Sequence, residues 1–164
     1  MKTLIAIAVA VALAPLVALS GEHGDKYAGE NRGKPLLPTQ TNAKWQQECG
    51  SCHLAFAPGL LPAASWRKIM AGLDKHFGTD AALSAQENRE ITAWLTDNAS
   101  NRWRAPSAPL RISETAWFQR KHDGHEIPAA VWQRPAVKSP ANCQACHVDA
   151  EKGDFNEHRI RIPK

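Results

Sequence analysis

The chain has 164 residues and carries 20 lysines and arginines against 16 aspartates and glutamates, a formal net charge of +4 at pH 7. This length allows one or two small domains. The basic residues are scattered and form no run long enough to follow a phosphate backbone, so the composition argues against a nucleic-acid partner.

The N-terminus has the pattern of a secretory signal peptide. Lys2 precedes an apolar run over residues 4–17, which only Pro15 interrupts. Small residues follow up to Ser20, as at a cleavage site. The alternative is a retained membrane anchor, but a spanning helix needs about 20 apolar residues, and this run is shorter. We therefore predict that residues 1–20 are a signal peptide, cleaved near Ser20.

The segment after the signal peptide is predicted to be an extended arm. Residues 21–41 are rich in glycine, proline, asparagine and charged side chains and show no apolar period. A first haem-binding domain is predicted over residues 42–100. It begins with a short helix from Trp45 to His53.

Two copies of the pentad Cys-x-x-Cys-His contain all four cysteines of the chain: Cys49, Cys52 and His53 in the first, and Cys143, Cys146 and His147 in the second. The pentad is the attachment signature of haem c, in which the thiols bond the porphyrin and the histidine is the proximal iron ligand. A zinc ribbon would place its two cysteine pairs about 15–20 residues apart, and these pairs are much further apart. We predict two covalently attached haem c groups and, because haem c is normally attached outside the cytoplasm, a bacterial periplasmic location.

The rest of the first domain contains a loop and two helices. The loop, residues 57–62, is apolar enough to cover a haem edge. A helix is predicted over residues 63–77, where one apolar stripe recurs at three- and four-residue steps. The stripe consists of Trp66, Ile69, Met70, Leu73 and Phe77. A second helix is predicted to begin at Ser84, with Glu87 completing a capping box.

The second half of the chain is less regular. Residues 101–110 contain two prolines and are predicted to be a linker. In the second haem domain, residues 111–164, Ser113 is expected to cap a short helix that runs to Lys121. Prolines at 128, 135 and 140 prevent longer helices. The predicted fold class is mainly α, with a small second domain that has little regular structure.

Each iron needs a ligand opposite its proximal histidine. For the first haem we favour His76, because a polar imidazole at the edge of an apolar helix face is costly unless it is bonded. The alternative for His76 is a cap at the helix C-terminus. Met70, the sole methionine left after removal of the signal peptide, is a second candidate, but a gap-filling core role suits it better.

For the second haem we favour His122, which lies four residues after Phe118 and so shares its helical face. His125 and His158 remain alternatives. His23, in the predicted arm, is expected to be a surface residue.

Several further motifs resemble those of the DHC-type dihaem cytochromes c of Gram-negative bacteria. They comprise Trp45 with CGSCHLA at 49–55, PGLLP at 58–62, Ser65-Trp66, M-x-G-L-x-x-HFG at 70–78, T-x-W-F at 115–118, RPAV at 134–137, NCQACH at 142–147 and GDF at 153–155. The resemblance covers nearly all of the chain after Thr41.

The resemblance implies an N-terminal domain similar to class I cytochrome c and an irregular C-terminal haem domain. It also implies bis-histidine iron, with His76 and, less clearly because of the neighbouring His125, His122 as the distal ligands. As partners it implies a small monohaem oxygen-binding cytochrome or a membrane cytochrome b.

These features predict an electron-transfer protein, not an enzyme, that is peripheral to the membrane at most and passes single electrons from a membrane donor to a soluble haem-protein acceptor. Two alternatives are an electron-feeding dihaem subunit of a periplasmic reductase and a ligand-binding or peroxidatic haem protein with one open iron. Two hypotheses remain for the cluster of acids after the second pentad. It borders the second haem and docks a basic partner surface, or it is part of a solvated tail of mixed charge with no such role. The acids are Asp149, Glu151, Asp154 and Glu157.

Overall fold

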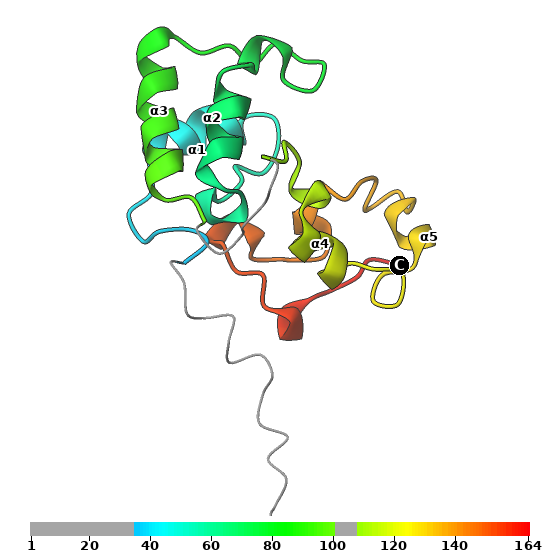
Figure 1. Cartoon of the computed structure of the whole chain (residues 1–164). Helices are drawn as coiled ribbons and strands as arrows, with labels where there is room; N and C mark the ends of the chain where they lie inside the picture. Colours follow the sequence, from blue (N-terminus) through cyan, green and yellow to red (C-terminus); the bar gives the residue numbers. More distant parts are fainter. Residues whose placement is uncertain (1–34, 101–107) are drawn as a thin grey trace, which may run out of the picture.

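The computed structural model describes residues 35–100 and 108–164, here called the N-terminal unit and the C-terminal unit. The predicted signal peptide, most of the predicted arm and most of the predicted linker lie outside these ranges. Within them the chain is helical and contains no strand, which confirms the mainly α prediction (Figure 1). No helix in these two ranges is long and apolar enough to cross a membrane.

Three α-helices form the N-terminal unit: α1 (Ala43–Gly50), α2 (Ala63–Met70) and α3 (Ala85–Asp97). Two 3₁₀ turns, η1 (Pro58–Leu60) and η2 (Leu73–Lys75), connect them. Helices α2 and α3 lie side by side (Figure 1). Their facing side chains, with Trp45 from α1, Leu61 before α2 and Ala99 after α3, form one hydrophobic core: Trp45, Leu61, Trp66, Met70, Ile91, Leu95 and Ala99.

Helix α3 begins as predicted. The Ser84 hydroxyl accepts the Glu87 N–H at 3.2 Å, and the Glu87 carboxylate accepts the Ser84 N–H at 3.2 Å, so the capping box is complete. This prediction succeeded because both residues of the motif belong to one turn.

Helix α2 ends at Met70 and not at Phe77 as predicted. The side-chain amide of Asn88, on α3, donates to the Met70 carbonyl at 2.9 Å and so caps the helix end. The Gly72 N–H then bonds the Ile69 carbonyl at 3.1 Å, a tighter 3₁₀-type closure. As a result the apolar stripe stops early, and Phe77 is exposed.

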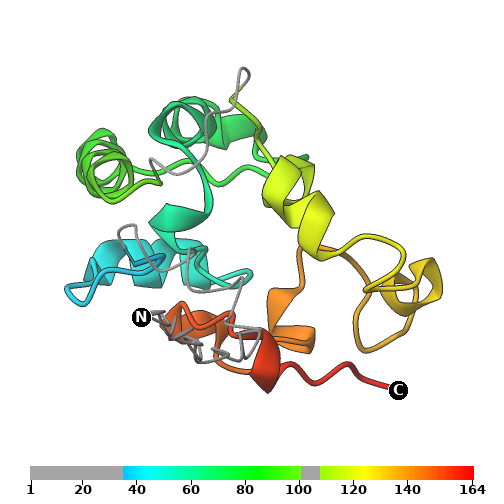
Figure 2. The ribbon, with the colours of Figure 1, turned by 60° about the horizontal axis from the view of Figure 1, so that its bottom comes forward.

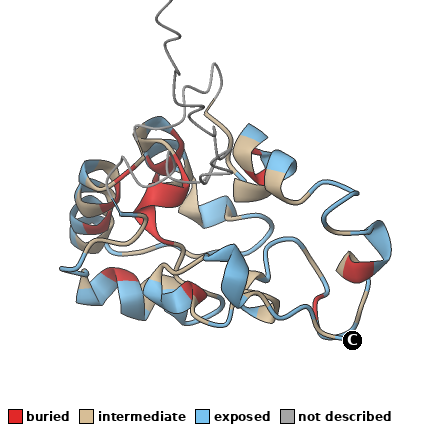
Figure 3. Cartoon of the chain, turned by 90° about the horizontal axis from the view of Figure 1, so that it is seen from below, coloured by how far each residue is buried: buried red, intermediate tan, exposed pale blue. Residues whose placement is uncertain are grey.

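The C-terminal unit is made of short elements: α4 (Ala116–Lys121), α5 (Ala129–Trp132) and the 3₁₀ turns η3 (Ile112–Glu114), η4 (Cys143–Ala145), η5 (Ala150–Lys152) and η6 (Glu157–Arg159). The cap of α4 is Thr115 and not Ser113, because η3 occupies the preceding residues and the Thr115 hydroxyl accepts the Phe118 N–H. Buried residues are scattered along this unit in short stretches (Figure 3).

The last residues of the predicted arm begin the N-terminal unit and pack against later residues of both units. The Leu36 carbonyl accepts the Gly59 N–H of the N-terminal unit at 2.8 Å. Leu37 packs on the N-terminal core and also lies against Gly153 of the C-terminal unit. Two adjacent leucines are too short a pattern to reveal this packing in the sequence.

Candidate haem sites

The first pentad begins in the last turn of α1. Asn42 caps this helix, since its side-chain oxygen accepts the Trp45 N–H at 2.9 Å. Trp45 is buried and fixes the helix to the core. Burial raises the pKa of the Cys49 thiol to about 11. Cys52 and His53 follow in an exposed turn, because the helix ends before them, earlier than predicted.

The imidazole of His53 is oriented by the backbone. Its Nδ1 lies 2.7 Å from the Leu54 carbonyl oxygen. A carbonyl can only accept, so Nδ1 carries the proton and Nε2 keeps its lone pair. Histidines that bind metals usually donate their other ring N–H in this way, which fixes the ring and raises its basicity.

His76 faces His53 because α2 stops early. The chain turns through η2, and the His76 carbonyl then accepts the Thr79 N–H at 3.0 Å. The ring centroids of His53 and His76 lie 6.2 Å apart, with the ring planes 24° apart. A metal–imidazole nitrogen bond is about 2.0–2.1 Å long, so two rings on opposite sides of one metal have centroids roughly 6 Å apart. The two imidazoles therefore fit one iron between them.

The second pentad is held by the C-terminal segment. Its first cysteine lies in η4, where burial raises the pKa of the Cys143 thiol to about 11. The Cys146 carbonyl accepts the Arg161 N–H at 2.9 Å, and Arg134 donates from Nη1 to the Pro163 carbonyl. Figure 2 shows this segment, in red, beside the orange pentad segment. The sequence analysis missed these contacts, because backbone bonds between distant residues leave no motif.

His122 follows directly after α4 and faces the second proximal histidine. Its ring stacks on Phe118, with centroids 4.0 Å apart and planes at 10°, and its Nδ1 lies 3.0 Å from the Phe118 carbonyl oxygen. Because a carbonyl can only accept, Nδ1 of His122 carries the proton and its Nε2 keeps a lone pair, as in His53. The centroids of His122 and His147 lie 6.1 Å apart, and the planes are 64° apart.

Three of these four imidazoles are partly buried, which lowers the pKa of His76, His122 and His147. For His76 the charges of His53 and Arg111 act in the same direction. A lowered pKa keeps the ring neutral, and the neutral ring is the form that binds a metal.

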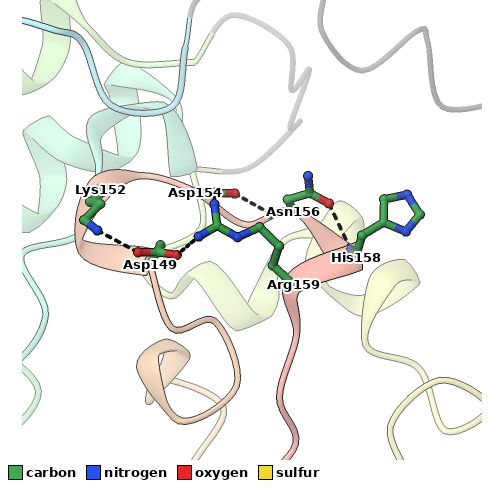
Figure 4. A network of polar contacts seen from close by, with 6 residues as sticks. All are labelled: Asp149, Lys152, Asp154, Asn156, His158 and Arg159. Atoms are coloured by element: carbon green, nitrogen blue, oxygen red, sulfur yellow. Dashed lines mark hydrogen bonds and ion pairs between the residues drawn. The ribbon is translucent and has the colours of Figure 1, made fainter.

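The alternative ligands occupy other places. Met70 lies in the hydrophobic core, 5% exposed, as expected of a core methionine. His125 is exposed, and its backbone N–H donates to the Asp123 carboxylate at 2.8 Å. His158 is also exposed, and its ring points away from the neighbouring polar network (Figure 4).

The acids of residues 149–157, which were expected to form a docking surface, are mostly paired with cations of the same chain. Arg159 pairs with both Asp149 and Asp154, and Lys152 also pairs with Asp149 (Figure 4). Glu157 lies 3.4 Å from the Lys121 ammonium of α4. Three of the four acids thus have cationic partners within the chain, so the segment is a surface ion-pair network that carries both signs of charge.

The donor set fits haem c at both sites. Each site offers two free thiols in one pentad and a proximal histidine, with a second imidazole at the separation that one iron requires. This fold and these sites define a dihaem c-type cytochrome.

Comparisons with known proteins agree. The family model of dihaem cytochrome c, DHC, matches residues 45–155. A dihaem cytochrome c from Rhodobacter sphaeroides is 39% identical, with a TM-score of 0.65 over 70% of this chain and 97% of that one. One from Shewanella baltica is 42% identical, with a TM-score of 0.66 over 74% of this chain and 93% of that one. No curated protein sequence matches significantly.

The chain therefore belongs to the DHC family of dihaem cytochromes c. It carries two covalently attached haem c groups, at Cys49 and Cys52 and at Cys143 and Cys146. Membership of this family implies electron transfer.

Proposed function

We propose that this cytochrome carries single electrons in the periplasm, from a membrane donor to a soluble haem-protein acceptor, through two bis-histidine haems. The supporting observation is the pair of imidazole separations, 6.2 Å for His53 and His76 and 6.1 Å for His122 and His147. Bound haem supplies an iron that gains and loses one electron. A histidine on each face leaves no coordination position for a substrate, which favours electron transfer over catalysis.

The residues around the imidazoles have complementary roles. The thiols hold the cofactor covalently. The carbonyls of Leu54 and Phe118 fix the tautomers of His53 and His122, so that each ring presents Nε2. Because histidine in place of methionine as the axial ligand lowers the potential, both sites should be more reducing than a histidine–methionine cytochrome.

Ligand replacement tests the assignment. His76→Met and His122→Met should each leave both haems attached and raise the potential of one haem, with a new sulfur-ligated spectrum. His125→Met is the matched control and should leave both potentials unchanged. A high-spin ferric signal in the wild type, with rapid carbon monoxide binding on reduction, would instead support a ligand-binding protein with one open iron.

Export is tested separately. The mature protein recovered from the periplasm should begin within a few residues of Gly21, and its intact mass should exceed that of the cleaved chain by two haem masses. Retention of the intact N-terminus in the membrane fraction would contradict cleavage near Ser20.

The proposed partners are a small monohaem oxygen-binding cytochrome and a membrane cytochrome b. Electron-transfer encounters usually bury less than about 1,200 Å², and their rates follow surface charge. Because the acids after the second pentad are paired internally, we expect rates to depend only weakly on salt. Stopped-flow oxidation of the reduced protein by the monohaem cytochrome tests this. A steep fall in rate with salt would show that another charged surface guides docking.

A further inference from the structure

The loop that carries His76 contains a strained aromatic residue. Phe77 has a φ of 49°, a left-handed conformation that is uncommon for a residue with a side chain. Phe77 is 48% exposed, although its side chain is large and apolar. Such a conformation is strained and persists only where surrounding contacts hold it. The contacts of Phe77 therefore indicate which interactions stabilise this conformation of the loop.

Two contacts hold the Phe77 ring. It meets the His76 ring edge-on, with centroids 4.9 Å apart and planes at 64°. The Arg111 guanidinium carbon lies 4.1 Å from the Phe77 centroid, in cation–π range. The aromatic ring thus contacts both the candidate distal ligand and a permanent positive charge.

The charge comes from the C-terminal unit. Arg111 precedes η3, and the next residue, Ile112, packs against the hydrophobic core of the N-terminal unit. This packing fixes the backbone of Arg111 beside the His76 loop. The Glu114 carboxylate lies 3.9 Å from Arg111 Nε. Both side chains are about half exposed, so this carboxylate offsets only part of the guanidinium charge.

We propose that the Arg111 guanidinium, held on Phe77 beside the first haem site, raises the reduction potential of that haem. The inference rests on the proposed ligation by His76. Reduction removes one positive charge from the iron, so a nearby fixed cation stabilises the reduced form. Arginine remains charged at all ordinary pH values. The two ring contacts place the guanidinium within about one Debye length, roughly 10 Å at 0.1 M salt, of the His76 ring.

Removing the charge of Arg111 and removing the charge of Glu114 should shift the reduction potential in opposite directions, which makes the test specific. Redox titration of the holoprotein at low salt should show that Arg111→Gln lowers the potential of the first haem more than that of the second. Glu114→Gln should raise it, because the guanidinium then loses its counter-charge. Arg111→Lys should restore most of the wild-type potential. Arg89→Gln, at an exposed position of α3, removes the same charge elsewhere and should change the potential of the first haem less.

The haem affected is identified as the one whose potential rises in His76→Met. The ferric spectrum of Arg111→Gln should remain low-spin, which shows that His76 is still bound. If Arg111→Gln leaves the first potential unchanged while His76→Met raises it, the role of Arg111 is refuted and the ligand assignment stands. If His76→Met raises no potential, the ligand assignment fails instead.

Discussion

Leu37 and Gly153 lie in direct contact, although they belong to opposite ends of the described chain. A Cβ built on Gly153 would lie 2.6 Å from the Leu37 Cβ, closer than real side chains approach. Gly153 also has a φ of 72°, which disfavours any side chain. Through this contact the end of the arm joins the C-terminal unit to the N-terminal core.

Gly153→Ala is therefore expected to destabilise the holoprotein by about 1–3 kcal/mol through overpacking, with backbone strain adding to the loss. Denaturant unfolding followed by far-UV circular dichroism measures this change. Gly124→Ala is the matched control, because a Cβ at Gly124 meets nothing within 4 Å, and its effect should stay within about 0.5 kcal/mol. Equal stability of the two variants would contradict the contact.

With the proposed bis-histidine ligation, the ring-plane angles predict two different ferric EPR signals. When two axial imidazoles are nearly parallel, they split the iron d orbitals that they overlap, and when they are crossed, the splitting shrinks and the g anisotropy grows. At 24° the pair of His53 and His76 should give an ordinary rhombic low-spin signal. At 64° the pair of His122 and His147 should give a more anisotropic one. Two identical signals would contradict these orientations.

Met70→Leu separates the core role of Met70 from a ligand role. The two side chains have similar volumes, so the substitution should cost less than about 1.5 kcal/mol and leave the visible spectrum unchanged. Spectra of the ferric protein, recorded beside its urea unfolding curve, provide both readings. Loss of a near-infrared sulfur-to-iron band that the wild type possesses would make Met70 the ligand in place of His76.

The capping box of α3 predicts a pH effect. Hydrogen bonds from the Ser84 hydroxyl and backbone N–H lower the pKa of Glu87 from its usual 4.5. The unfolded chain therefore binds this proton more readily than the folded one. The stabilisation is fully present above pH 4.5 and is lost as the pH falls through the lower, folded value.

Ser84→Ala should cost about 1 kcal/mol at neutral pH, because the Glu87 N–H loses its acceptor, and should weaken the loss of stability below pH 4.5. Ser84→Thr, which keeps the hydroxyl, is the control. Unfolding curves for the three proteins at several pH values test this. Parallel curves for wild type and Ser84→Ala would show that Glu87 does not contribute to the pH dependence.

Features that depend on residues close together in the chain could be predicted from the sequence. The pentads indicated two haem attachments because two thiols and a histidine must lie within one turn to serve one porphyrin. The capping box was predicted for the same reason. The end of α2 was not, because an amide on α3 caps Met70 while the apolar stripe continues to Phe77. The sites of Leu37 and Arg111 also depend on partners far along the chain, and no local pattern specifies them.

The long-range hydrogen bonds and ion pair around the second pentad affect when the second site forms during folding. Lys121 pairs with Glu157 across 36 positions, and Arg134 bonds the Pro163 carbonyl across 29. Closing such loops costs chain entropy before any contact compensates for it. We therefore expect the second site to take its final shape only when residues 157–163 are available to close around its pentad.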